Sequence, residues 1–141
     1  GWHVILHSCG KINLLVPRLI SLGVDMLNMQ QPRAYGLVEF GRQFAGKVCF
    51  LTTADIQNTL PRGVEEEVRE EVRLLVEHWS TPAGGLVVFN YGDPCAIGAN
   101  PRMTRVMFDE FVKQMHHWDK AGTGSPRARD DPARQDGRTR G

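Results

Sequence analysis

Four short apolar runs, separated by segments with a helical pattern, constrain the fold of this chain most strongly. They cover residues 2–7, 24–28, 47–52 and 86–90. Each run has the length of a strand, and each intervening segment is long enough for a helix that crosses back over a sheet. The pattern predicts an α/β fold of four β/α units with parallel, apolar strands.

Helices are predicted at residues 13–22, 36–44 and 64–79, and from Pro101 to about Trp118. Gly23 suits the C-terminal cap of the first helix. The third helix carries one apolar stripe, and its acidic and basic residues are predicted to form a solvent-exposed face. Those charged residues are Glu65, Glu66, Glu67, Arg69, Glu70, Glu71 and Arg73. In the fourth helix, a stripe of Met103, Met107, Phe111 and Met115 is predicted to lie in the core.

The segment from Asp119 to the end is predicted to be a disordered charged tail, because its only apolar residues are alanines. It holds six of the 17 Lys and Arg and four of the 16 Asp and Glu, which leaves 11 against 12 for residues 1–118. This near-neutral balance argues against a nucleic-acid partner. No apolar stretch approaches the roughly 18 residues of a membrane span. Three cysteines without a secretory leader predict a cytoplasmic protein with reduced thiols.

Three candidate metal ligands follow two of the predicted strands. His7 and Cys9 stand where the first run ends, and Cys95 follows the last run. If these strand ends meet at one barrel mouth, the two thiols and the imidazole form an open zinc site. The alternative is that both cysteines are unrelated buried residues and that His7 is a core histidine bonded to backbone. Cys49, inside the third run, is predicted to serve packing alone.

A series of motifs resembles the C-terminal half of the uroporphyrinogen decarboxylase superfamily, over about residues 2 to 115. The motifs are His-Ser-Cys-Gly at 7–10, Gly-Val-Asp at 23–25, Asp-Ile-Gln at 55–57 with Leu-Pro at 60–61, Glu-Glu-Val-Arg-Glu at 66–70 and Gly-Gly at 84–85. The resemblance implies a TIM-type β/α barrel. It also implies one of two chemistries: decarboxylation of a tetrapyrrole in haem biosynthesis, or zinc-dependent methyl transfer from a corrinoid to a thiol.

The spacing of His7, Cys9 and Cys95 resembles the methyltransferase branch. That resemblance implies zinc as cofactor, a methylcobamide as co-substrate and a corrinoid protein as a possible partner. Bound zinc deprotonates a thiol at neutral pH. Decarboxylation is the second expectation. It is disfavoured because no histidine stands near Tyr91, where the decarboxylases place one, and an inactive barrel fragment is the third.

Further site candidates follow the predicted strands. The resemblance places Asp55 beside the substrate as a catalytic residue, whereas capping of a helix before Ile56 is the alternative. Gln57 either contacts substrate or closes the turn. Asn28 and Gln30 end the second strand at the same mouth and, with Tyr91, are predicted to line a site for a small-molecule substrate.

Four β/α units make only half of a closed barrel, which needs eight strands and about 250 residues. The sequence begins inside a predicted strand, so we expect residues 1–118 to be the C-terminal half of the barrel. A half barrel has open sheet edges, which favour association. We therefore expect the missing N-terminal half or a second copy as a partner, and no activity from the isolated fragment.

Overall fold

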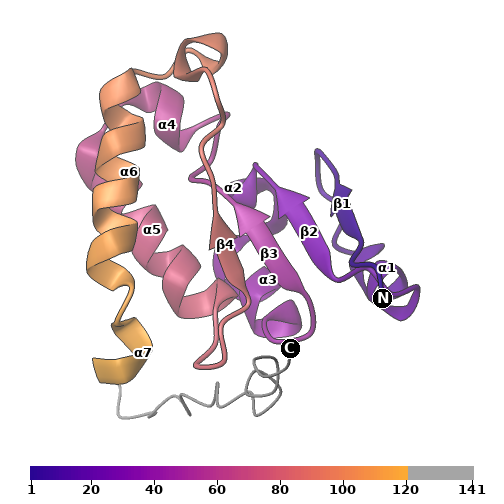
Figure 1. Cartoon of the computed structure of the whole chain (residues 1–141). Coiled ribbons are helices and arrows are strands. Elements are labelled where there is room, and N and C mark those ends of the chain that lie inside the picture. The colour runs from indigo at the N-terminus through magenta and orange to yellow at the C-terminus, as the bar shows by residue number, and fades with distance from the viewer. Residues whose placement is uncertain (121–141) are drawn as a thin grey trace, which may run out of the picture.

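The computed structural model describes residues 1–120 and shows an α/β fold with one four-stranded sheet (Figure 1). The strands are β1 (Ile5–His7), β2 (Met26–Met29), β3 (Cys49–Thr52) and β4 (Leu86–Val88). They are all parallel and lie side by side in chain order. The predicted four parallel strands are confirmed. Each is shorter than its apolar run, because β1, β2 and β3 begin two or three residues into their runs and β4 ends two residues before its run does.

One or more helices follow each strand. They are α1 (Val16–Ser21), α2 (Pro32–Tyr35), α3 (Leu37–Phe44), α4 (Thr59–Arg62), α5 (Glu65–Trp79), η1 (Pro94–Ile97), α6 (Pro101–Gln114) and α7 (His117–Lys120). The short α2, α4 and η1 were not predicted, because four-residue helices are too brief to show a periodic pattern. Among the described residues, no helix has the length and apolar character to cross a membrane.

The helices cover one face of the sheet. Leu27 pairs in register with Phe50, and both side chains are completely buried on the helix-facing side. Residues on the other side alternate with them, and at the edges these are exposed, with 58% of Ile5 and 41% of Val87 accessible. The prediction that both faces are covered is therefore wrong for the described residues. The apolar character of both faces had suggested two covering layers.

The core lies between the sheet and helices α3 and α5. Trp79 of α5 packs against Phe50 of β3 and Phe40 of α3, with ring centroids 4.8 and 5.2 Å away. Its indole nitrogen donates a hydrogen bond to the carbonyl oxygen of Leu37 at 2.7 Å. The three rings are completely buried. This aromatic cluster joins the third strand to two successive helices.

Two expectations about the later helices are wrong. The charge pattern predicts a solvent-exposed Glu71, yet its side chain is completely buried. Helix α6 ends at Gln114 rather than near Trp118, and Met115, at its C-cap, is 68% exposed instead of joining the core stripe. Of the predicted tail, Asp119 and Lys120 belong to α7, and the remainder lies outside the described residues.

Charged residues join α5 to α6. Glu110 of α6 is 3% exposed, and its carboxylate accepts hydrogen bonds from Arg73 at 3.1 Å and from Arg69 at 3.3 Å. Burial raises the pKa of Glu110. Hydrogen bonds from Gln114, Arg73 and Arg69 lower that pKa by more, so its net value falls below the ordinary 4.5.

We expect Glu110→Gln to reduce the free energy of unfolding by about 1–2 kcal/mol at neutral pH, since both arginines are partly exposed and solvent screens them. A lowered pKa gives a contribution that is present above pH 4.5 and is lost as the pH falls through the lowered value. The difference between wild type and variant should therefore shrink in acid. Urea unfolding at several pH values measures it, with exposed Asp109→Asn as the control. An equal difference in acid and at neutral pH would contradict the assignment.

Candidate functional site

A thiol and an imidazole meet at the carboxyl end of β1. The Cys9 sulfur lies 3.4 Å from Nε2 of His7, and both side chains are exposed. On its other side, Nδ1 of His7 lies 3.2 Å from the backbone oxygen of Asn28 and 3.3 Å from its Oδ1. A backbone oxygen can only accept, so Nδ1 carries the proton and Nε2 presents its lone pair toward Cys9. The sheet register places His7 beside Asn28, and this pairing orients the ring.

This pair has the separation of two ligands on one zinc ion. Zinc bonds of about 2.0–2.1 Å to nitrogen and about 2.3 Å to sulfur place neighbouring tetrahedral ligands about 3.5 Å apart. The 3.4 Å between Nε2 and Sγ matches that spacing. In zinc sites, the second ring nitrogen of a histidine ligand typically donates to an oxygen, as His7 does to Asn28. The donor atoms of His7 and Cys9 therefore fit zinc.

Cys95 does not join them in this structure. It is an exposed residue of η1, which follows β4, whereas the pair lies at the carboxyl end of β1. Since β1 and β4 are the two outer strands, the full width of the sheet separates them. Among residues 1–120, no three His, Cys, Asp or Glu side chains are close enough to share a metal ion. A single copy thus assembles two of the three predicted ligands.

Residues missed by the sequence analysis hold the loop that carries Cys9. The Tyr35 hydroxyl donates to the carbonyl oxygen of Ser8 at 3.2 Å, and the Gly10 amide donates to Oε1 of Gln31 at 2.8 Å. Both supporting side chains are buried. Burial raises the pKa of Tyr35 to about 12, with Cys9 and Asp55 adding to the effect, so the hydroxyl keeps its proton and remains a donor. Both residues follow the second predicted strand, which was the available signal.

Asp55 lies just beyond β3 and is completely buried. One carboxylate oxygen accepts from the amides of Gln57 and Asn58 at 2.9 and 2.8 Å, and the other accepts from the amide of Arg33 at 3.2 Å. This is the hydrogen-bond pattern of a capping residue. With its oxygens turned to backbone amides, Asp55 shapes the loop at the carboxyl edge.

Glu71 of α5 forms hydrogen bonds with the same region. Its carboxylate accepts from the Asp55 amide and from the Arg33 guanidinium, both at 2.6 Å, and from the Thr59 hydroxyl. Burial raises the pKa of Glu71, although these three donors each lower it. The signal for this role is the position of Glu71 within the apolar stripe, three residues after Val68 and four before Leu75. The network ties the loops after β2 and β3 to one helix.

The remaining predicted residues are distributed along the carboxyl edge. Asn28 is half-buried in β2, beside His7. Gln30 follows β2, and its carbonyl oxygen accepts from the Ile56 amide at 3.3 Å. Gln57 is exposed in the turn that Asp55 caps. Tyr91 is half-buried after β4. The structure thus brings Asn28 to the His7–Cys9 pair, whereas the other three belong to neighbouring loops.

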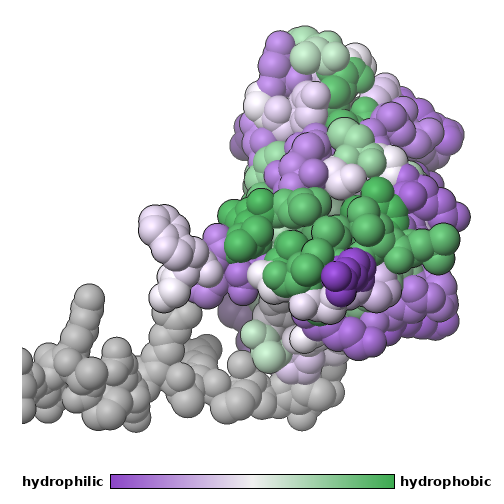
Figure 2. Space-filling model, turned by 90° about the vertical axis from the view of Figure 1, so that its right-hand side faces the viewer, coloured by the Kyte–Doolittle hydropathy of each residue, from purple (hydrophilic) through white to green (hydrophobic). Residues whose placement is uncertain are grey.

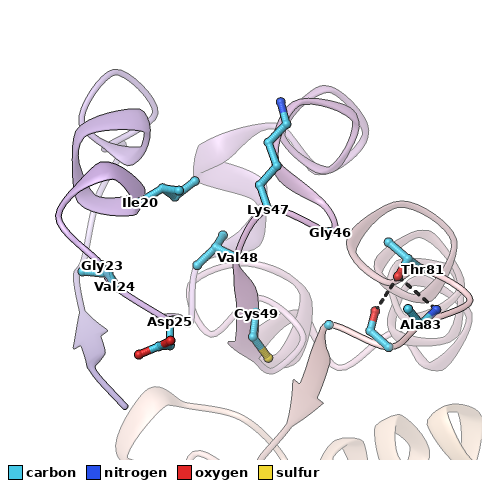
Figure 3. Close-up of a pocket in the computed structure, with 12 residues that line it drawn as sticks. Ile20, Gly23, Val24, Asp25, Gly46, Lys47, Val48, Cys49, Thr81 and Ala83 are labelled. Carbon is cyan, nitrogen blue, oxygen red and sulfur yellow. Dashed lines mark hydrogen bonds between the residues drawn. The ribbon is translucent and has the colours of Figure 1, made fainter. Parts of the chain in front are cut away.

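A separate pocket of about 440 Å³ lies at the edge of the sheet where the strands begin. The loops that lead into β2, β3 and β4 line it, and the Lys47 side chain extends away from Asp25 and Cys49 (Figure 3). Cys49 is half-buried, and burial raises the pKa of its thiol. This pocket lies at the end of the strands opposite to His7 and Cys9. In β/α barrels that end contributes to stability rather than to catalysis.

Comparisons with protein-family models, curated proteins and solved structures find no match to this chain. The chemistry of the site therefore follows from its own geometry. That geometry consists of a thiol, an oriented imidazole and supporting polar side chains at the carboxyl edge of a parallel sheet.

Proposed function

We propose that this chain is part of a β/α-barrel enzyme of the uroporphyrinogen decarboxylase type, and that it transfers a methyl group from a corrinoid to a thiol. The observation that carries the proposal is the exposed His7–Cys9 pair with its 3.4 Å separation of Nε2 and Sγ. It lies at the carboxyl end of a strand, where barrels of this type hold their chemistry.

The side chains near the pair have separate tasks in this proposal. His7 and Cys9 would hold a zinc ion, and Cys95, the third predicted ligand, would have to be brought to them from the opposite outer strand. Zinc, when bound, would lower the pKa of an acceptor thiol and supply it as a nucleophile. Asn28 holds the His7 ring in the tautomer that leaves Nε2 free. Tyr35 and Gln31 fix the backbone on both sides of Cys9.

The overall reaction balances without an added oxidant or reductant. The acceptor sulfur forms a bond to the methyl carbon while the cobalt–carbon bond of the methylcobamide breaks. The electron pair of that bond stays on cobalt, and the thiol proton passes to solvent. The acceptor in this proposal is a small-molecule thiol.

The metal content of the purified chain tests the proposal. After removal of loosely held metal and incubation with zinc alone, we expect about one zinc per chain, as an open site with a single metal position requires. Replacement of one ligand in Cys9→Ser or His7→Ala should weaken zinc binding by at least about 10–100-fold, since even supporting residues outside the ligand set contribute that much. Plasma mass spectrometry and competition with a chelating dye measure both quantities.

Cys49→Ser is the matched control, because that cysteine lies at the opposite edge of the sheet and should leave zinc binding unchanged. If the native chain holds no zinc, or if Cys9→Ser binds as much as wild type, zinc-dependent methyl transfer is wrong. A metal-free decarboxylase reaction would then become the better candidate.

A further inference from the structure

The sheet leaves one face without a covering layer in the described part of the chain. Two rows of side chains point to this face from adjacent strands, and most of them are apolar. One row consists of Ile5, Met26 and Cys49. The other row consists of His7, Asn28, Leu51 and Val87. A parallel sheet with an apolar face in water is unusual, because parallel sheets are almost always covered on both sides.

Both outer strands also lack a neighbour on one side. Strand β1 pairs only with β2, and β4 pairs only with β3, within residues 1–120. Apolar side chains near β1 and α1 are largely exposed, with 97% of Trp2 and 99% of Leu14 accessible, and Leu22 and Leu15 beside them are exposed as well. Figure 2 shows apolar residues gathered on the side of the molecule where Figure 1 places β1 and α1.

The β4 side of the molecule has its own exposed apolar residues. Val112 lies near the end of α6 and Met115 directly follows that helix, and 63% and 68% of these residues are accessible. Residues 121–141 contain alanine as their only hydrophobic residue type, so that segment has no large apolar side chains to cover either side. Within residues 1–141, no segment with large apolar side chains is left over to cover the open face.

We propose that, for the isolated chain of residues 1–141, the occupant is a second copy, which closes the two sheets into one eight-stranded parallel barrel. A two-fold axis along the strands places β1 of each copy beside β4 of the other. All strands remain parallel in this arrangement, because the axis runs in the strand direction. Both free edges of both copies are then paired, so no exposed edge remains.

Three features favour a second copy over an unrelated partner. The two free edges belong to one parallel sheet. A single two-fold rotation pairs both edges and gives a closed dimer rather than an open row of copies. Four strands from each copy make eight, the number at which side chains just fill the interior of a barrel. The rows that contain Ile5 and Val87 would become that interior. Outside it, α6 of one copy would lie beside α1 of the other, which covers the exposed side chains on both.

The closed arrangement has a consequence that can be measured. Within one copy, Cys9 follows β1 and Cys95 follows β4, at opposite edges of the sheet. At each contact between copies these strands become neighbours, so Cys9 of one copy lies close to Cys95 of the other. The two Cys9 residues, in contrast, lie across the barrel from each other. This inference uses the thiols only as probes and does not depend on zinc or on methyl transfer.

Two single-cysteine chains test the arrangement. One is Cys49→Ser/Cys95→Ser and keeps Cys9, whereas the other is Cys9→Ser/Cys49→Ser and keeps Cys95. The two chains are mixed in the presence of a metal chelator and treated with a short bismaleimide. We expect a covalent heterodimer from the mixture and no covalent dimer from either chain alone. Sedimentation equilibrium of wild type should give twice the chain mass of 15.8 kDa.

A lysine on the uncovered face should prevent the association. Ile5→Lys is expected to weaken dimerisation at least about tenfold, because closure would bury an unpaired ammonium group. Val64→Lys is the matched control, since Val64 is similarly exposed at 43% but precedes α5 rather than lying on the sheet. Circular dichroism confirms that both variants keep their helices. A monomeric wild type, a Cys9–Cys9 link, or a dimer without the mixed link would overturn the closed barrel.

Discussion

Replacing Glu71 by alanine is expected to lower the free energy of unfolding by about 2–6 kcal/mol. The carboxylate accepts hydrogen bonds from the Asp55 amide and the Thr59 hydroxyl, and both residues are completely buried. Each buried donor left without an acceptor costs about 1–3 kcal/mol. The Arg33 guanidinium adds less, because its side chain is 44% exposed and can turn to water. Chemical denaturation measures the loss, which is large beside a typical domain stability of about 5–15 kcal/mol.

Glu70→Ala is the matched control on the same helix. Its carboxylate is 59% exposed and pairs with Arg73 at the surface, so its removal should change stability by less than about 0.5 kcal/mol. Hydrogen exchange adds a local readout, since the Asp55 amide should lose protection in the Glu71 variant. Equal losses of stability in the two alanine variants would contradict the role of this network.

The raised pKa of Glu71 gives the same network a dependence on pH. A carboxyl group whose pKa is higher in the folded state binds its proton more tightly there, so its stabilising contribution is greatest below the ordinary value of 4.5. That contribution is lost as the pH rises from 4.5 through the raised value. Glu71→Gln lacks this titration and keeps the shape of the side chain. Wild type should therefore lose stability relative to Glu71→Gln across that pH range.

Gly41→Ala is expected to destabilise the fold by about 3 kcal/mol, the upper part of the range for overpacking. Helix α3 approaches α5 so closely at this point that an added Cβ would lie 2.3 Å from the His78 carbonyl oxygen and 2.7 Å from its carbon. These are backbone atoms, so no rotation of a side chain relieves the clash. The two helices would have to move apart, which would loosen the contacts of Phe40 and Trp79. Thermal and urea unfolding measure the effect.

Gln43→Ala is the control for helix α3, because this exposed side chain contacts only Glu39 among the described hydrogen bonds. Alanine at an exposed helical position should leave stability nearly unchanged or slightly improved. If Gly41→Ala were as stable as wild type, the close approach of α3 and α5 would be wrong. The close approach at Gly41 is visible only in the structure, since a glycine within a helical sequence pattern does not reveal which residue packs against it.

Part of the candidate site could be predicted from strand ends. His7, Cys9 and Asn28 follow or end apolar runs, and parallel strands bring their carboxyl ends to one edge of a sheet. Sequence position marks Tyr35, which follows the second predicted strand, and Glu71, which lies within an apolar stripe, but it does not predict the role of either residue. Glu71 lies in a run of charges whose other members are partly or fully exposed, and the loops that pack on α5 bury it. Tyr35 acts through a hydroxyl that reaches Ser8, 27 residues earlier in the chain.

The sequence by itself determined the four strands, their parallel order and the main helices, because alternation of apolar runs and helical stripes is a local property of the chain. Tertiary structure alone decided three further matters. It separated Cys95 from the His7–Cys9 pair, because β1 and β4 are the outer strands of one sheet. It buried Glu71 beneath the loops after β2 and β3. It also left one apolar face open, since the coverage of a face depends on where distant helices pack and not on the strand residues themselves.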